Sequence, residues 1–348
     1  MFLGKPEKGG SLTEFLAGHV RWLNRARTTT GRLSPFSDLF KLADFAILDI
    51  GARGGAPEWT TPLAPYTRYF ACEPDPAAAA LLKAALGTAH AWKSVTIVQQ
   101  ALAEPPGPTK LYVTRHTGMS SLLKPNLEVV NTFGLENEFT IEHEVTVSAV
   151  TLREAAARYG FEDLSLIKVD TQGTELNILQ SGRDLLAGPV QGVFVEVEFR
   201  PFYQGQPLFS EVETFLRGLD FELISLEGVT RRRTNTGWRV GYSRREITWA
   251  HALFVKRAIE PGTMSANLLF RRTVQQIGIA MAREQFDLAA ERLMLPHFQD
   301  ELARRGLSVG LSDLDSFVQR TFSRPSYKWF CARWPTIEKN RDRRYCRW

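Results

Sequence analysis

The chain has 348 residues, of which 44% are hydrophobic and 23% are charged; this is enough for one large core with an appendage, or for two domains. No apolar run reaches the roughly 18 residues of a membrane-spanning helix, and the first residues lack the apolar centre of a signal peptide. The three cysteines form no CxxC pair, so we expect a reduced, cytoplasmic protein without a membrane span.

In chain order, residues 1–44 are expected to be a helical lead, with a helix over residues 12–27. Residues 45–257 form a domain in which short apolar runs alternate with helix-like stretches, a pattern that predicts a mostly parallel sheet covered on both faces. The run WAHALFVKR (249–257) follows its predecessor without a helical pattern and is expected to return antiparallel. The other runs are FAILDI (45–50), YFACEP (69–74), SVTIVQQAL (94–102), LSLIKVD (164–170), GVFVEVEF (192–199) and FELISLEG (221–228).

Two long inserts interrupt this alternation. The first insert covers residues 115–139, and residues 109–114 and 141–150 look like extra strands on either side of it. The second insert covers residues 228–247 and separates the last two strands. Loops of this length inside a compact domain are usually functional or disordered. From residue 258 onwards the pattern is mainly helical, and 15 Lys and Arg residues stand against 10 Asp and Glu residues. This basic extension therefore carries the net charge of +5.

The stretch ILDIGARGG (47–55) ends the first predicted strand, where open α/β sheets bind their ligands. A dinucleotide fingerprint fits poorly, because Arg53 and Ala56 stand where its second and third glycines belong. An S-adenosylmethionine turn fits better: Asp49 precedes Gly51, and Gly55 follows four residues later. In that interpretation Asp49 supplies negative charge near the ammonium group of the ligand. An ordinary glycine-rich turn between a strand and a helix remains an alternative.

Glu73 ends the second predicted strand, in FACEPDP. A carboxylate at this position can accept hydrogen bonds from both hydroxyls of an adenosine ribose, each worth about 1.5–3 kcal/mol. Dinucleotides and S-adenosylmethionine both contain such a ribose, so Glu73 does not choose between them. It can also be read as a carboxylate placed favourably before the following helix.

Five segments in this order resemble the FkbM-type S-adenosylmethionine-dependent methyltransferases: ILDIGARGG, FACEPDP, QQALAEPPGPTKLYV, TGMSSLL and LIKVDTQGTELNILQSG. The resemblance covers roughly residues 45–257, and Arg53 stands where many relatives carry asparagine. It implies a class I methyltransferase fold, Rossmann-like, with an antiparallel last strand. It also implies S-adenosylmethionine as cofactor, bound across the glycine turn. The expected cofactor-binding residues are Asp49, Gly51, Ala52, Arg53, Gly55, Glu73, Pro74, Gln100, Ala101, Ser120 and Asp170.

Methyl transfer to a hydroxyl needs a proton acceptor, and the candidates lie where strands end. Asp170 ends LIKVD, and Lys168 shares its side of the strand by the two-residue alternation. Glu175 follows in the first turn of the next helix. These three residues could form a catalytic base with its tuning partners, or a structural ion pair with a helix-start glutamate. His116, in the first insert, is a further candidate base because an unperturbed imidazole titrates near neutrality.

Candidate acceptor contacts gather around the next strand. Glu196 and Glu198 alternate with apolar residues in VFVEVEF and therefore share one face. One of them could bind the acceptor or join Asp170 at a metal ion; because no histidine accompanies these acids in the sequence, the metal is the less favoured alternative. Further candidate contacts with the acceptor are Arg200, Tyr203, Ser121 and the run Arg231–Arg233.

Many relatives of this type look like O-methyltransferases of sugars, polyketides or other secondary metabolites, so we expect a small-molecule or glycan acceptor. The alternative of a nucleic-acid methyltransferase draws on Trp334, Tyr345 and Trp348 in the basic tail. It is disfavoured because residues 1–257 have no net charge and contain no NPPY-like tetrad. A third alternative is a non-catalytic scaffold that forms homo-oligomers through the C-terminal extension.

Overall fold

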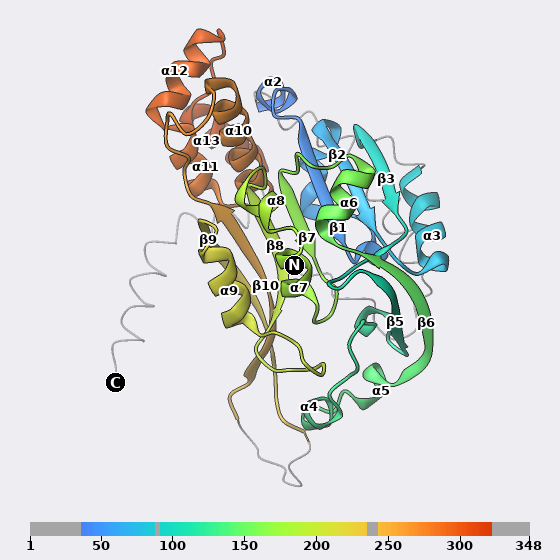
Figure 1. The fold of residues 1–348 in the computed structure, drawn as a ribbon. Helices are drawn as coiled ribbons and strands as arrows, with labels where there is room; N and C mark the ends of the chain where they lie inside the picture. The colour runs from blue at the N-terminus through green and yellow to red at the C-terminus, as the bar shows by residue number, and fades with distance from the viewer. Residues whose placement is uncertain (1–35, 88–90, 235–242, 322–348) are drawn as a thin grey trace.

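The computed structural model describes residues 36–87, 91–234 and 243–321 (Figure 1). The helix expected over residues 12–27 and the aromatic end of the basic tail lie outside the described residues. A seven-stranded sheet forms the centre, in the order β3-β2-β1-β7-β8-β10-β9. Its strands are β1 (Phe45–Ile50), β2 (Thr67–Cys72), β3 (Ser94–Val98), β7 (Leu166–Val169), β8 (Gly192–Glu198), β9 (Phe221–Arg231) and β10 (Glu246–Lys256).

The strand directions confirm the expected sheet. Parallel pairing joins β3, β2, β1, β7 and β8 in turn, whereas β10 pairs antiparallel with both β8 and β9. Strand β10 thus lies between β8 and β9 and runs in the opposite direction to both. This is the class I methyltransferase arrangement, Rossmann-like, and it places the ends of β1, β2, β7 and β8 at one edge of the sheet.

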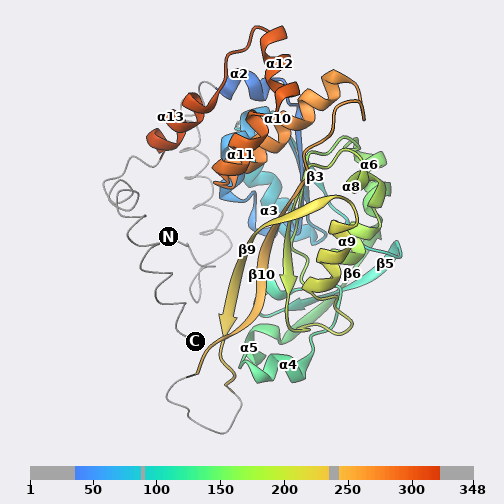
Figure 2. The same cartoon turned by 90° about the vertical axis from the view of Figure 1, so that its left-hand side faces the viewer.

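Helices cover both faces of the sheet, which stands between two helical layers in Figure 2. On β1, Ala46 and Leu48 pack toward one layer and Ile47 packs toward the other, as expected for side chains that alternate along a strand. The first layer holds α6 (Leu152–Tyr159), α7 (Glu175–Gln180), α8 (Arg183–Ala187) and α9 (Phe209–Arg217). The second holds η3 (Glu58–Tyr66), α3 (Pro76–Gly87) and α10 (Ala266–Ala282).

Helix α6 shows why this alternating pattern was readable from sequence. Thr151 accepts a hydrogen bond from the backbone N–H of Glu154, and the Glu154 side chain accepts one from the backbone N–H of Thr151, which completes a capping box. Gly160 ends the helix in the left-handed conformation, with φ of 71°. Start and stop signals therefore lie on either side of the helical pattern.

The strands around the first insert form a separate three-stranded sheet beside the main one (Figure 1), with β6 between β4 and β5. Both extra strands that the sequence predicts are present. The prediction of one strand over residues 94–102 was wrong: β3 ends at Val98, and the next two strand residues pair with β6 in the second sheet. The elements of this region are β4 (Ala101–Leu102), β5 (Gly107–Thr114), η4 (Thr117–Met119), α4 (Leu127–Thr132), α5 (Glu136–Phe139) and β6 (Ile141–Val150).

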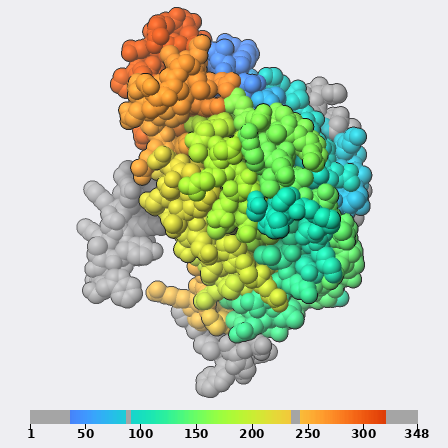
Figure 3. Space-filling model, viewed as in Figure 1, coloured from blue at the N-terminus to red at the C-terminus, as the bar shows by residue number. Residues whose placement is uncertain are grey.

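The helices after β10 pack on the main domain and on α2 (Phe36–Lys41), and they stand out as one lobe in Figure 3. Phe36 of α2 meets Phe317 edge-on, with ring centroids 6.4 Å apart. The Gln276 amide of α10 donates to Gln191 beside β8. Besides α10, the lobe contains α11 (Phe286–Leu293), α12 (Pro296–Arg304) and α13 (Leu311–Thr321). In the described part of the chain, no helix combines the length and apolarity needed to cross a membrane.

Candidate active site

The glycine turn after β1 is shaped by its close approach to the end of β7. Gly51 has a φ of 78°, a backbone conformation that residues with side chains rarely adopt. A Cβ atom on Gly51 would lie 2.0 Å from the backbone oxygen of Asp170. The Gly51 N–H donates to the oxygen of Cys72, at the end of β2. The turn therefore joins the ends of three neighbouring strands.

Asp49 is fully buried beneath this turn. Its carboxylate lies 2.9 Å from the Lys168 ammonium and accepts a 2.6 Å hydrogen bond from the Tyr69 hydroxyl. Lys168 also donates to the backbone oxygen of Gly51. Burial lowers the pKa of Lys168, but the carboxylates of Asp49 and Asp170 outweigh it and raise that pKa. Asp49 and Lys168 therefore hold the turn in place from below.

This arrangement differs from the expected grouping of Lys168 with Asp170 and Glu175. Asp49 and Lys168 are direct partners in the parallel register of β1 and β7, so their side chains lie side by side on one face of the sheet. Glu175 instead accepts hydrogen bonds from the backbone N–H groups of Thr171 and Gly173 and closes the loop after β7. The ion pair of Lys168 is therefore with Asp49, outside the predicted group, and Glu175 binds the loop at the start of its own helix.

Glu73 lies at the end of β2 and is 4% exposed. One of its oxygens accepts from the backbone N–H of Asp75, and the other lies 3.8 Å from the Arg53 guanidinium. Arg53 also pairs with Asp75 and donates to the backbone oxygen of Thr117 in the first insert. Burial raises the pKa of the Glu73 carboxyl, and the Arg53 charge opposes that shift. Arg53 thus links the glycine turn, the end of β2 and the insert.

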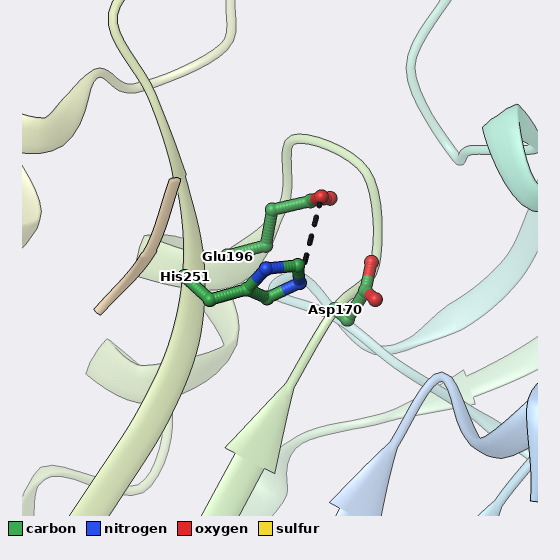
Figure 4. Close-up of side chains that lie close together, drawn as sticks. All are labelled: Asp170, Glu196 and His251. Atoms are coloured by element: carbon green, nitrogen blue, oxygen red, sulfur yellow. Dashed lines mark ion pairs between the residues drawn. The ribbon is translucent and has the colours of Figure 1, made fainter. Parts of the chain in front are cut away.

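A group of three side chains forms where β7, β8 and β10 lie next to one another: Asp170, Glu196 and His251 (Figure 4). One oxygen or nitrogen atom from each lies within 4.8 Å of the others. Glu196 and His251 are direct partners in the antiparallel register of β8 and β10, and such partners project from the same face. Asp170 follows Val169, the partner of Val195 in β8. The register across three strands therefore assembles the group.

Gln172 ties the two carboxylates of this group together. It has a φ of 63°, in the left-handed region, and its amide N–H₂ donates to both Asp170 and Glu196. The Gln172 amide oxygen accepts from the Tyr203 hydroxyl, and the backbone oxygen accepts from Ser121. Glu196 uses Oε2 toward Gln172 and Oε1 toward His251, whose Nε2 lies 3.9 Å away.

Two further buried carboxyls lie close to this group. Burial raises the pKa of the Glu175 carboxyl to about 7, although backbone N–H donors oppose the shift. Burial, and then the charges of Glu175, Glu196 and Asp170, raise the pKa of Glu198 well above its usual range. The edge of the sheet at the ends of β7 and β8 is therefore crowded with acidic groups, which is costly unless positive charge or protons compensate.

Other residues proposed from the sequence lie elsewhere or are engaged by the protein itself. His116 precedes η4, and its Nδ1 is buried with no hydrogen-bond partner among the described residues. The histidine beside Asp170 is instead His251. Tyr203 is 1% exposed, so it supports Gln172 from behind instead of lining an open surface. Five more lie as follows: Gln100 contacts Arg158 and Tyr159, Ser120 accepts from the Thr114 N–H, Arg200 and Arg233 pair with Glu246, and Arg231 stacks on Trp249.

The remaining cofactor candidates line the glycine turn or the strand ends beside it. Ala52 is fully buried in η2 (Ala52–Gly54), and Gly55 follows with a φ of 80°. Pro74 is half-buried after Glu73. Ala101 is buried in β4, in the second sheet. Ala52, Gly55 and Pro74 thus follow the ends of β1 and β2, where the resemblance implies the cofactor, whereas Ala101 belongs to the second sheet.

His251 and Gln172 are the residues of this site that sequence reasoning missed. His251 stands in WAHALFVK between two buried alanines. This alternation was a signal that its side chain lies on the opposite face of the strand, but it did not indicate which residue of the neighbouring strand it meets. Gln172 lies in DTQGTE, the most specific segment of the family resemblance. Its left-handed backbone conformation could not be read from that segment.

A family model for the methyltransferase FkbM domain matches residues 49–223. No curated protein matches the chain. Among solved structures, the precorrin-6y C5,15-methyltransferase of Geobacter metallireducens is 14% identical, with a TM-score of 0.31, over 66% of this chain and 88% of its own. TrmK of M. capricolum with S-adenosylhomocysteine is 7% identical, with a TM-score of 0.32, over 82% and 96%.

The family match, and not these weak structural similarities, carries the assignment. It spans the glycine turn, Glu73, Asp170 and Glu196, and it extends into β9. The turn, with backbone approach at Gly51 and a buried carboxylate at Glu73, suits the cofactor of this family. The chain belongs to the FkbM methyltransferase family, which uses S-adenosylmethionine as its methyl donor.

Proposed function

We propose that this protein methylates a hydroxyl group of a small molecule or glycan. The observation that supports this acceptor chemistry is the group Asp170, Glu196 and His251, which lies at the end of β7, beyond the glycine turn. A neutral hydroxyl is a weak nucleophile, so its methylation calls for a site that removes its proton. Two carboxylates and an imidazole are residues of the right type for that task.

The residues around the glycine turn divide the work of binding. Gly51, Ala52 and Gly55 offer backbone for close approach, and the Glu73 carboxylate receives the ribose hydroxyls of the cofactor. When bound, the cofactor supplies a methyl group whose bond to sulfur breaks as the bond to the acceptor oxygen forms, the electron pair remaining on sulfur. Asp170, Glu196 and His251 position the acceptor hydroxyl and promote the loss of its proton. Gln172 and Tyr203 keep the carboxylates in position.

The test is a methyl-transfer assay with the full chain, methyl-labelled S-adenosylmethionine and three acceptor classes: hydroxylated metabolites, free glycans, and total RNA. We expect label in one of the first two classes, with mass spectrometry placing the methyl group on oxygen. Asp170→Asn should lose this activity, whereas Asp184→Asn, an exposed carboxylate on α8, should retain it. Label confined to RNA, or methyl groups found only on nitrogen or carbon, would overturn the proposal.

A further inference from the structure

The residue types in the group of Asp170, Glu196 and His251 go beyond what a simple base requires. A proton acceptor needs one basic atom, but this group brings three together: one from β8, one from β10 and one from the residue that follows β7. Glu196 is 3% exposed, while Asp170 and His251 are half-buried. Carboxylate oxygens with one imidazole nitrogen are a common ligand set for divalent cations such as Mn²⁺ and Zn²⁺.

The separations within the group match those between ligands of one ion. Oxygen and nitrogen ligands bond to such ions at about 2.0–2.2 Å, so ligands of one ion lie on the order of 3–4.5 Å apart. His251 Nε2 lies 3.9 Å from Glu196 Oε1, and all three ligand atoms lie within 4.8 Å of one another. In Figure 4 the three side chains point toward a common centre from separate strands. A cation could therefore bind with only small movements of the side chains.

The contacts around the group resemble the outer shell of a metal site. Ligating carboxylates are typically fixed by further hydrogen bonds, and Gln172 provides one to each carboxylate here. Gln172 is in turn held by Tyr203 and Ser121. The left-handed backbone of Gln172, with φ of 63°, costs free energy that such a functional arrangement explains.

The electrostatic environment also favours a cation. The carboxylates of Asp170 and Glu196 lie within 4.8 Å of each other near the ends of β7 and β8, and like charges at such a distance repel. The nearby Lys168 ammonium forms its ion pair with Asp49, at 2.9 Å. A divalent ion between Asp170 and Glu196 would place positive charge between these two carboxylates.

We propose that Asp170, Glu196 and His251 bind a divalent cation whose open coordination positions receive the oxygen of the acceptor. This inference rests on the proposed hydroxyl methylation and specifies how the group acts. Three protein ligands leave coordination positions for an exogenous oxygen. A hydroxyl bound there loses its proton to water more readily, because the ion lowers the pKa of the hydroxyl. The O–H electron pair stays on oxygen and becomes the nucleophile. This proposal takes up the less favoured alternative from the sequence, a metal ion at Asp170.

The experiment measures Mn²⁺ binding to the full chain, freed of metals with a chelator, by electron paramagnetic resonance. We expect one Mn²⁺ per chain. Asp170→Asn, Glu196→Gln and His251→Gln should each weaken binding by at least about tenfold. The control variants are His143→Gln and Glu144→Gln, which alter exposed residues on β6 and should bind Mn²⁺ like the wild type. Absence of stoichiometric binding, or binding unchanged in all three site variants, would overturn the proposal.

A second measurement does not depend on how well the variants fold. Pulsed electron paramagnetic resonance of Mn²⁺ on the wild-type chain should show a directly coordinated nitrogen nucleus, which is the signature of an imidazole ligand. A bound ion without that nitrogen would contradict a site that includes His251. Neither measurement uses a methyl donor or acceptor, so their failure leaves hydroxyl methylation standing. Conversely, a metal-binding chain that labels only RNA would refute the acceptor class while retaining the cation site.

Discussion

The backbone oxygen of Asp170 lies 2.0 Å from the point that a Cβ atom on Gly51 would occupy. The glycine that the sequence associates with approach of a cofactor is thus already required by the protein's own neighbouring strand. One contact fixes the glycine turn, the proposed cofactor side of the site, against Asp170, the first residue of the proposed acceptor side. The two halves of the candidate site cannot shift independently at this point.

Gly51→Ala should therefore destabilise the protein more than a left-handed glycine alone explains. Gly160 is the matched control, because its φ of 71° is similar and a Cβ atom added there would meet nothing within 4 Å. Gly160→Ala should cost about 1–2 kcal/mol from backbone strain. Gly51→Ala should cost about 1–3 kcal/mol more, because it also forces the backbone of β7 to move. Urea unfolding of both variants gives the comparison; equal losses would contradict the close contact.

The buried pair of Asp49 and Lys168 should respond to single and double substitution differently. Lys168→Met leaves the Asp49 charge buried without its cation, which should cost about 3–5 kcal/mol. Asp49→Asn in that background should restore part of the loss, because no charge then remains buried. A double-mutant cycle in urea measures the coupling. Arg257→Ala, which breaks an exposed pair with Glu222, should cost only about 0–1 kcal/mol; additive losses at Asp49 and Lys168 would refute their coupling.

Glu73→Ala should weaken binding of S-adenosylmethionine about ten- to a hundredfold, because charge-assisted hydrogen bonds to the ribose are lost. The fold should persist, since the variant removes a carboxylate that is costly to bury. Isothermal titration calorimetry gives the affinity, and thermal unfolding without ligand reports on the fold. Glu222→Ala, at an exposed residue, is the control. An unchanged affinity in Glu73→Ala would exclude Glu73 from the ribose contact.

Asp170→Asn should bind S-adenosylmethionine within about tenfold of the wild type and yet turn over at least about a hundredfold more slowly. The amide keeps an oxygen that can accept from Gln172, so the loop after β7 is preserved, but it neither takes a proton nor carries charge. Calorimetry and a single-turnover assay separate these two effects. Turnover at the wild-type rate would remove Asp170 from the chemistry.

The elements that the sequence predicted best are those whose signals are local. Strand β1 and strand β6 have the expected bounds. Strand β1 is a continuous apolar run that ends at the glycine turn, and β6 ends at the helix cap Thr151. Helix α6 lies between its cap at Thr151 and Gly160. The run over residues 94–102 contains neither glycine nor proline to mark the break after Val98. Only the pairing of Ala101 with Ala149, far along the chain, separates the two strands.

The candidate site divides in the same way. Asp170 and Glu196 could be placed at the active edge because each stands at or near the end of an apolar run. His251 could not be placed beside them, because its position depends on the register between β8 and β10, which are separated in sequence by α9, β9 and the second insert. The engagement of Lys168 with Asp49 instead of Asp170 likewise follows from the register of β1 and β7. Sequence alone indicates which edge carries the chemistry, and strand register decides which side chains meet there.

The apolar core shared by α2 and the C-terminal helices determines which segments of this protein can be removed without loss of the fold. The α10 backbone at Gly278 packs directly against Phe45 of β1 and Leu63 of η3. The interface between the main sheet and the C-terminal helices is therefore part of the hydrophobic core and not a flexible connection. A methyltransferase domain produced without these helices would expose this apolar surface to water and would tend to aggregate. Chimeras of two family members should therefore fold only when the methyltransferase domain and its flanking helices come from the same parent protein.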